Sequence, residues 1–161
     1  MTVRRAFIAA FLIGLLIGGV SFSAHFAWVR HETQQTLCAH NLKLVSGSLH
    51  RYARDHNGRL PKVWSELYPD YLGTDPNYIR EVLQCPTLLR KTDLADQAPI
   101  KPEFFETVDY VLIPGRTLSD DSDTVLAYER GSNHWDTGHA ELYVDGRAAW
   151  NTSNEPVSAE E

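Results

Sequence analysis

The sequence has few cysteines and methionines and fewer basic than acidic residues, and the shortage of positive charge excludes one class of protein. Its 161 residues include two Cys and one Met, with 15 basic against 21 acidic residues and a net charge of −6. A nucleic-acid-binding module is expected to be basic, so we predict no nucleic-acid partner. With one long apolar run, the chain cannot be a bundle of several membrane spans. Four Trp, seven Tyr and six Phe argue against a disordered chain.

Charge is absent altogether from residues 6–29. As a helix rising 1.5 Å per residue, this run would be about 36 Å long, enough to cross a hydrocarbon core of about 30 Å. Arg4 and Arg5 precede it, which favours a cytoplasmic N-terminus at residues 1–5. We therefore predict a single-pass protein of the inner (cytoplasmic) membrane, with a transmembrane helix over 6–29 and a periplasmic domain over 30–151. A cleaved secretory signal is the alternative.

The periodicity of the rest of the chain predicts an α+β fold. Apolar residues recur at helical steps of four and three in the set Cys38, Leu42, Val45, Leu49 and Tyr52. Gly58 is placed to end this helix. From residue 108 the period becomes two, and this predicts strands over 108–113, 124–129, 140–144 and 147–150. We expect one long N-terminal helix, its first half spanning the membrane, packed on an antiparallel sheet of three or four strands.

The last two strands flank Asp145-Gly146, a sequence typical of a hairpin turn in which both residues have positive φ. The polar and acidic residues 152–161 that follow are predicted to be a disordered tail.

Both cysteines are expected to be structural. If the domain lies in an oxidising compartment, Cys38 and Cys85 should form a disulfide. Such a bond would close a loop of about 48 residues and stabilise the fold by roughly 4 kcal/mol. Two buried free thiols are the alternative. A metal site on the cysteines is disfavoured, because neither has a second Cys or His at ligand spacing nearby.

The chain contains residue types that act in catalysis, such as Ser, His and Asp, but they form no recognisable catalytic motif. No Gly-x-Ser-x-Gly sequence occurs, and no pair of carboxylates stands out. His134, Asp136 and His139 could hold a metal or line a cleft, but their spacing matches no standard zinc motif. We therefore predict that the chain is not an enzyme, and an anchored enzyme built on these three residues is the alternative.

One acidic loop could bind an ion. It offers hard oxygen ligands suited to calcium at Asp120, Asp121 and Asp123. The loop lacks the Gly and the terminal Glu of an EF-hand, and a solvated acidic turn is the preferred explanation. We predict no cofactor, with calcium at these three residues as the candidate exception.

Several short sequences, in a specific order, resemble bacterial pilin-like proteins. These include the type II secretion pseudopilins and the planctomycete prepilin-type proteins. The matching pieces are the helix at 38–52, the exit Leu60-Pro61 and Gln84-Cys85-Pro86. His134 followed by Asp145-Gly146 resembles the C-terminal His…Asp-Gly signature of that family.

The resemblance implies a structural or assembly component of type II secretion or type IV pilus-type machinery. Its partners would be the inner membrane and other pilin-like subunits or the assembly platform. The chain departs from the family at Phe11, where a prepilin would carry Glu. The alternative is a membrane-tethered ligand-binding module on a pilin-like fold.

Overall fold

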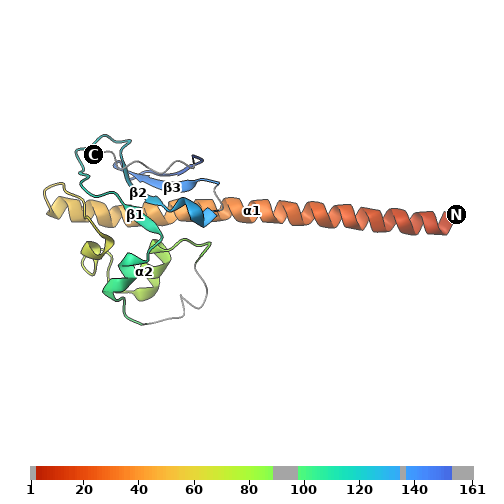
Figure 1. Ribbon diagram of the computed structural model, residues 1–161, viewed down its shortest axis with the longest axis horizontal. Helices are drawn as coiled ribbons and strands as arrows, with labels where there is room; N and C mark the ends of the chain where they lie inside the picture. The colour runs from red at the N-terminus through yellow and green to blue at the C-terminus, as the bar shows by residue number, and fades with distance from the viewer. Residues whose placement is uncertain (1–2, 89–97, 135–136, 154–161) are drawn as a thin grey trace. The chain divides into compact units, whose positions relative to one another are not determined.

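The structure is a computed structural model that describes residues 3–88, 98–134 and 137–153, and these form a mixed helix and sheet fold. The elements in chain order are α1 (Val3–Asp55), η1 (Trp64–Leu67), α2 (Pro76–Leu83), η2 (Pro102–Glu106), β1 (Tyr110–Leu112), β2 (Val125–Glu129), η3 (Gly131–His134), β3 (His139–Tyr143) and β4 (Ala148–Asn151) (Figure 1). The predicted α+β class is confirmed. The chain divides into two compact units, residues 1–34 and 35–161, and α1 contributes to both.

The first unit is the upstream part of α1, and its large apolar side chains are exposed from Phe11 onward. The exposed fractions reach 67% at Phe11, 68% at Leu16 and 67% at Phe22. Over the residues that the structure describes, no helix is both long and apolar enough to cross a membrane.

This finding contradicts the transmembrane helix predicted over residues 6–29. It equally contradicts the single-pass inner-membrane localisation that followed from it, with residues 1–5 in the cytoplasm and 30–151 in the periplasm.

In the second unit, α1 buries one face completely. Four of the five predicted positions have no exposed surface: Cys38, Leu42, Val45 and Leu49. The fifth, Tyr52, is only partly buried, and its neighbour Ala53 is fully buried instead. The helix ends at Asp55. Gly58, with φ of 83°, donates its N–H to the carbonyl of Ala53 at 2.7 Å, as the predicted stop requires.

The sheet has four antiparallel strands in the order β1-β2-β3-β4. The strands begin and end within two residues of the predicted positions. The β3–β4 turn differs from the prediction, because Gly146 has φ of 79° and Asp145 is not among the positive-φ residues. Gly146 donates its N–H to the carbonyl of Tyr143, which makes a three-residue loop with Gly in the left-handed position.

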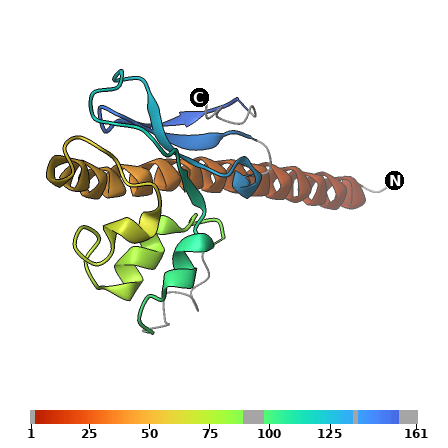
Figure 2. The same cartoon turned by 60° about the vertical axis from the view of Figure 1, so that its left-hand side comes forward.

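The downstream part of α1 is covered on two sides. Figures 1 and 2 show β2 and β3 on one side of it and α2 on the other. On the α2 side, polar residues of α1 are buried but satisfied. Asn41 donates to the carbonyl of Glu81, and Ser48 donates to the carbonyl of Tyr71, each at 2.8 Å. The core therefore lies around residues 38–53 of α1.

Removing core volume from this face should destabilise the domain. We expect Leu49→Ala to lower the free energy of unfolding by about 2–5 kcal/mol, because a fully buried leucine leaves a cavity. Leu44→Ala is the matched control on the same helix. Its side chain is 42% exposed, so the change should stay within about 0.5 kcal/mol. Urea unfolding followed by circular dichroism measures both, and equal losses would contradict the assignment of faces.

Candidate functional site

Four buried side chains from four separate elements meet beside α1. Cys38 comes from the buried face of α1, Cys85 follows the end of α2, Glu129 is the last residue of β2 and His134 is the last residue of η3. Their exposed fractions are 0%, 0%, 0% and 1%. One donor atom from each lies within 4.8 Å of every other, so the four form a single cluster, here called the Cys₂-Glu-His cluster.

The imidazole of His134 is central to this cluster. Its Nε2 lies 3.2 Å from Sγ of Cys38, 3.4 Å from Sγ of Cys85 and 3.1 Å from Oε1 of Glu129. Sγ of Cys38 is in turn 3.5 Å from Sγ of Cys85 and 3.3 Å from Oε1 of Glu129. Two sulfurs, one nitrogen and one carboxylate oxygen thus converge on a common point.

Strand alternation explains why an acid lies in the core. Glu129 is two residues after the buried Ala127, and side chains two apart on a strand share a face. Ala127 is opposite Leu112 of β1, and Glu129 is opposite Tyr110. All four residues are buried, so Glu129 occupies the sheet face that packs on α1.

Neighbouring groups hold the cluster in place. Asp109 accepts a hydrogen bond from the backbone N–H of Cys85 at 2.8 Å, and Asn133 donates to Oε1 of Glu129 at 3.3 Å. The hydroxyl of Thr87 lies 3.4 Å from Nδ1 of His134, the ring nitrogen that points away from the sulfurs. These contacts orient the cysteine, the carboxylate and the imidazole.

The pKa values of the two thiols are driven apart. The hydrogen bond between them lowers the pKa of Cys85 to about 6 and raises that of Cys38, which burial raises further. Burial alone would lower the pKa of His134, but its contacts with Cys85 and Glu129 outweigh burial and raise it to about 9. Burial favours the neutral form of Glu129, yet the contact with His134 lowers the pKa of this carboxyl. The cluster thus favours a thiolate at Cys85 and a carboxylate at Glu129 beside a protonated His134, with Cys38 as the neutral thiol.

The predicted cysteine pair is brought together as two free thiols. The Sγ–Sγ distance of 3.5 Å is well beyond the roughly 2.05 Å of a disulfide bond. The structure therefore has the alternative state, two buried thiols, and the disulfide stays a prediction for oxidising conditions.

The other predicted metal residues do not gather as expected. His134 joins the cysteines, whereas Nε2 of His139 pairs with Oε1 of Glu141 at 3.1 Å, and Asp136 lies outside the described residues. Glu129 was missed by the sequence analysis. Its only signal was an acid at an inward position of the second predicted strand. No local spacing connects it to the cysteines.

The acidic loop is held by its own turn. Asp120 accepts from the backbone N–H and the hydroxyl of Thr117, at 3.0 and 2.8 Å, and Asp121 accepts from the backbone N–H of Asp123 at 3.0 Å. Within the described part of the chain, the grouping of metal-binding side chains is the Cys₂-Glu-His cluster, and these aspartates form none. The geometry gives the calcium prediction no support.

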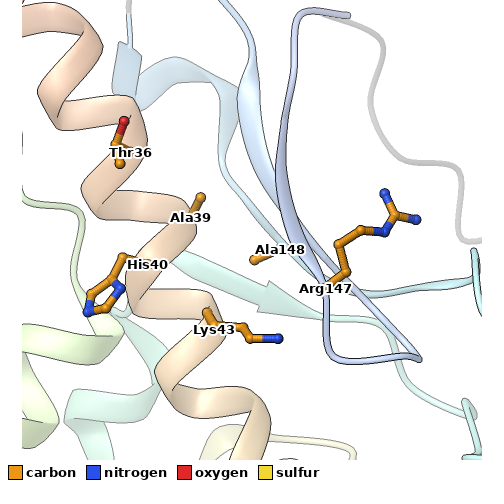
Figure 3. Close-up of a pocket in the computed structure, with 6 residues that line it drawn as sticks. All are labelled: Thr36, Ala39, His40, Lys43, Arg147 and Ala148. Carbon is orange, nitrogen blue, oxygen red and sulfur yellow. The ribbon is translucent and has the colours of Figure 1, made fainter.

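A shallow groove lies between α1 and the β3–β4 hairpin (Figure 3). It is lined by Thr36, Ala39, His40, Lys43, Arg147 and Ala148. Lys43 donates to the carbonyl of Gly146 at 2.6 Å, and Arg147 pairs with Asp123 and Asp145. The two cations therefore bind the chain itself. Gly146 also approaches α1 closely, because a Cβ there would lie 2.9 Å from Oγ of Ser46.

Comparison with models of known protein families, with curated proteins and with solved structures found no match. The function is consequently inferred from the geometry of the chain and from the sequence resemblance.

The state of the thiols can be measured by counting them. Because both cysteines are fully buried, we expect the folded, anaerobically purified chain to resist alkylation by a maleimide. Denaturation in the presence of the reagent should then add two equivalents, read from the intact mass. A chain that takes up none until a reductant is added would instead carry the disulfide.

Proposed function

We propose that this chain is a structural, non-enzymatic subunit of a pilin-like assembly, which associates with related subunits through the upstream part of α1. One observation carries the proposal. A helix whose later residues form the core of an α+β domain leaves a dense set of large apolar side chains exposed further upstream: Phe11, Leu12, Ile13, Leu15, Leu16, Ile17, Val20, Phe22, Phe26 and Trp28.

The physical argument is the cost of leaving this surface in water. Burial of apolar area is favourable by about 25 cal/mol per Å², or roughly 1.5–3 kcal/mol for a large side chain. Monomeric proteins rarely keep a contiguous patch of this kind exposed, and large patches mark interaction sites. The apolar residues surround α1 rather than forming one stripe, so we infer that several neighbouring helices cover it.

Small residues in the same segment favour close helix contact. Gly14 and Gly18 are four residues apart and lie on one face of α1. A Cβ at either position would meet nothing within 4 Å. A partner helix can therefore approach the backbone at these points more closely than it could at larger residues.

The pilin-like character of the assembly rests on the sequence resemblance. The helix, the Leu60-Pro61 exit, the Cys85-Pro86 pair and the Asp145-Gly146 hairpin follow one another in the order of that family. The α+β class with an antiparallel sheet is consistent with it. We infer that the partners are other pilin-like subunits or the assembly platform of a type II secretion or type IV pilus-type machinery.

Site-specific photo-crosslinking in the cells of origin tests this proposal. A photoreactive residue in place of Leu16, in the full chain, should crosslink to a second copy or to another chain with an apolar N-terminal helix, because Leu16 lies in the proposed contact. The matched position is Arg54, which is exposed at the other end of the same helix and should give few or no adducts. Mass spectrometry identifies the adducts.

Adducts from position 16 that contain only chains without an apolar helix would contradict the proposal, as would the absence of any adduct. As a further check, Leu16→Glu and Phe22→Glu in combination should abolish the adducts formed from a photoreactive residue at Ile13, because two buried charges would oppose association.

A further inference from the structure

The donor atoms of the Cys₂-Glu-His cluster are of the types that zinc binds. Zinc takes cysteine sulfur, histidine nitrogen and carboxylate oxygen, and structural zinc sites have four ligands in tetrahedral geometry. Calcium and magnesium instead take oxygen ligands, and this cluster offers one carboxylate. Soft sulfur donors combined with an imidazole favour zinc among the common divalent ions.

The distances between the donor atoms are close to those around a tetrahedral ion, and the sulfurs are too far apart for a disulfide. Bond lengths of about 2.3 Å to sulfur and 2.0–2.1 Å to nitrogen or oxygen imply that tetrahedral donors lie about 3.3–3.8 Å apart. Five of the six separations run from 3.1 Å, between His134 and Glu129, to 3.5 Å, between the two sulfurs, which is within or up to 0.2 Å below that range. A disulfide would account for the two cysteines alone. An ion accounts for all four side chains.

Burial of the carboxylate is the second, independent observation. Glu129 has no exposed surface, and among the described residues its Oε2 has no hydrogen-bond partner. Buried carboxylate oxygens in proteins normally accept a hydrogen bond or coordinate a metal, because an oxygen without either is costly. The contact between Thr87 and Nδ1 of His134 has the form of the support that orients metal-binding histidines, whose other ring nitrogen bonds a neighbour.

We propose that Cys38, Cys85, Glu129 and His134 bind one zinc ion, a structural site that joins α1 to the sheet. Zinc binds cysteine as the thiolate and histidine as the neutral imidazole, so binding displaces whichever protons Cys38, Cys85 and His134 carry. Four protein ligands without an exposed surface leave no open position for water or substrate, which distinguishes a structural zinc site from a catalytic one. This inference is independent of the proposed assembly function.

The consequence is that zinc couples distant parts of the chain. The four ligands are separated in sequence by up to 96 residues, the spacing between Cys38 and His134. Because the unfolded chain has no preformed site, binding energy adds to folding stability. The bound ion would also exclude the Cys38–Cys85 disulfide, since its sulfurs would then be ligands.

The test uses the full chain, purified anaerobically without a metal-chelating column. Elemental analysis by mass spectrometry should find about one zinc per chain. After removal of zinc under reducing conditions, added Co²⁺ should produce the intense visible bands of a tetrahedral cobalt–thiolate site, and Zn²⁺ should displace them. Chelation should also lower the midpoint of thermal unfolding, and zinc should restore it.

Variants assign the ion to these residues. We expect Glu129→Gln to weaken zinc binding by at least the roughly 10–100-fold that loss of a partner outside the coordination sphere costs. The matched control is Glu141→Gln. Glu141 is also buried and also contacts a histidine, His139, at 3.1 Å, but it is not part of the cluster. This variant should retain one zinc with unchanged affinity.

Three outcomes would overturn the proposal. The first is reduced wild-type chain that contains no zinc and gives no cobalt spectrum, a result that does not depend on the folding of any variant. The second is a Cys38–Cys85 disulfide in the anaerobically purified chain. The third is one zinc per chain that survives in Cys38→Ser/Cys85→Ser, which would place the ion elsewhere. None of these outcomes bears on the crosslinks formed from Leu16.

Discussion

The second unit depends on the contact between one face of α1 and the inner face of the sheet. Leu42, Val45 and Leu49 have no exposed surface there, and neither has Leu142 of β3. A small domain has little other apolar area to bury, so this interface supplies much of the stability of the unit. The positions of α2, the hairpin and η3 follow from it, because each of them is attached to the helix or to the sheet.

The same interface explains why polar groups are found in the core. Cys38 is one turn before Leu42 on the buried face of α1, and Glu129 is on the sheet face that meets it. Packing the two elements together therefore forces a thiol and a carboxylate into the interior. Cys85 and His134 then enter from the segments next to the sheet. An ion that neutralises these donors would turn an unfavourable burial into a link between the helix and the sheet.

The helix thus has two different tasks along its length. Around residues 38–53 its apolar side chains pack against other buried residues of the same chain and form part of the hydrophobic core. Between Phe11 and Trp28 the large apolar side chains are exposed, and this exposure is the basis for an assembly role. The two tasks are separable, because the first unit and the second unit are distinct bodies of contacts. The loss of association need not affect the domain, and the loss of the cluster need not affect association.

Local patterns predicted the elements well and their long-range partners poorly. The period of four and three at Cys38 to Leu49 depends only on helix geometry, and the alternation in residues 124–129 depends only on strand geometry, so both were readable from the sequence. The hairpin at Asp145-Gly146 was readable for the same reason. The turn type was not, because Gly146 alone takes a positive φ there, and it lies close to Ser46 of α1, a neighbour that is distant in sequence.

The sequence by itself determined an α+β chain with a striped helix, four short strands and two cysteines in the core. Only the tertiary structure decided what those cysteines meet. Glu129 and His134 are 91 and 96 positions downstream of Cys38, and they reach its sulfur because the sheet folds back on α1. No sequence motif of fixed spacing predicts contacts between residues so far apart. The sequence also suggested a membrane span that the described residues do not contain. An apolar segment is stabilised when it is removed from water, but its composition does not specify whether lipid or another helix buries it.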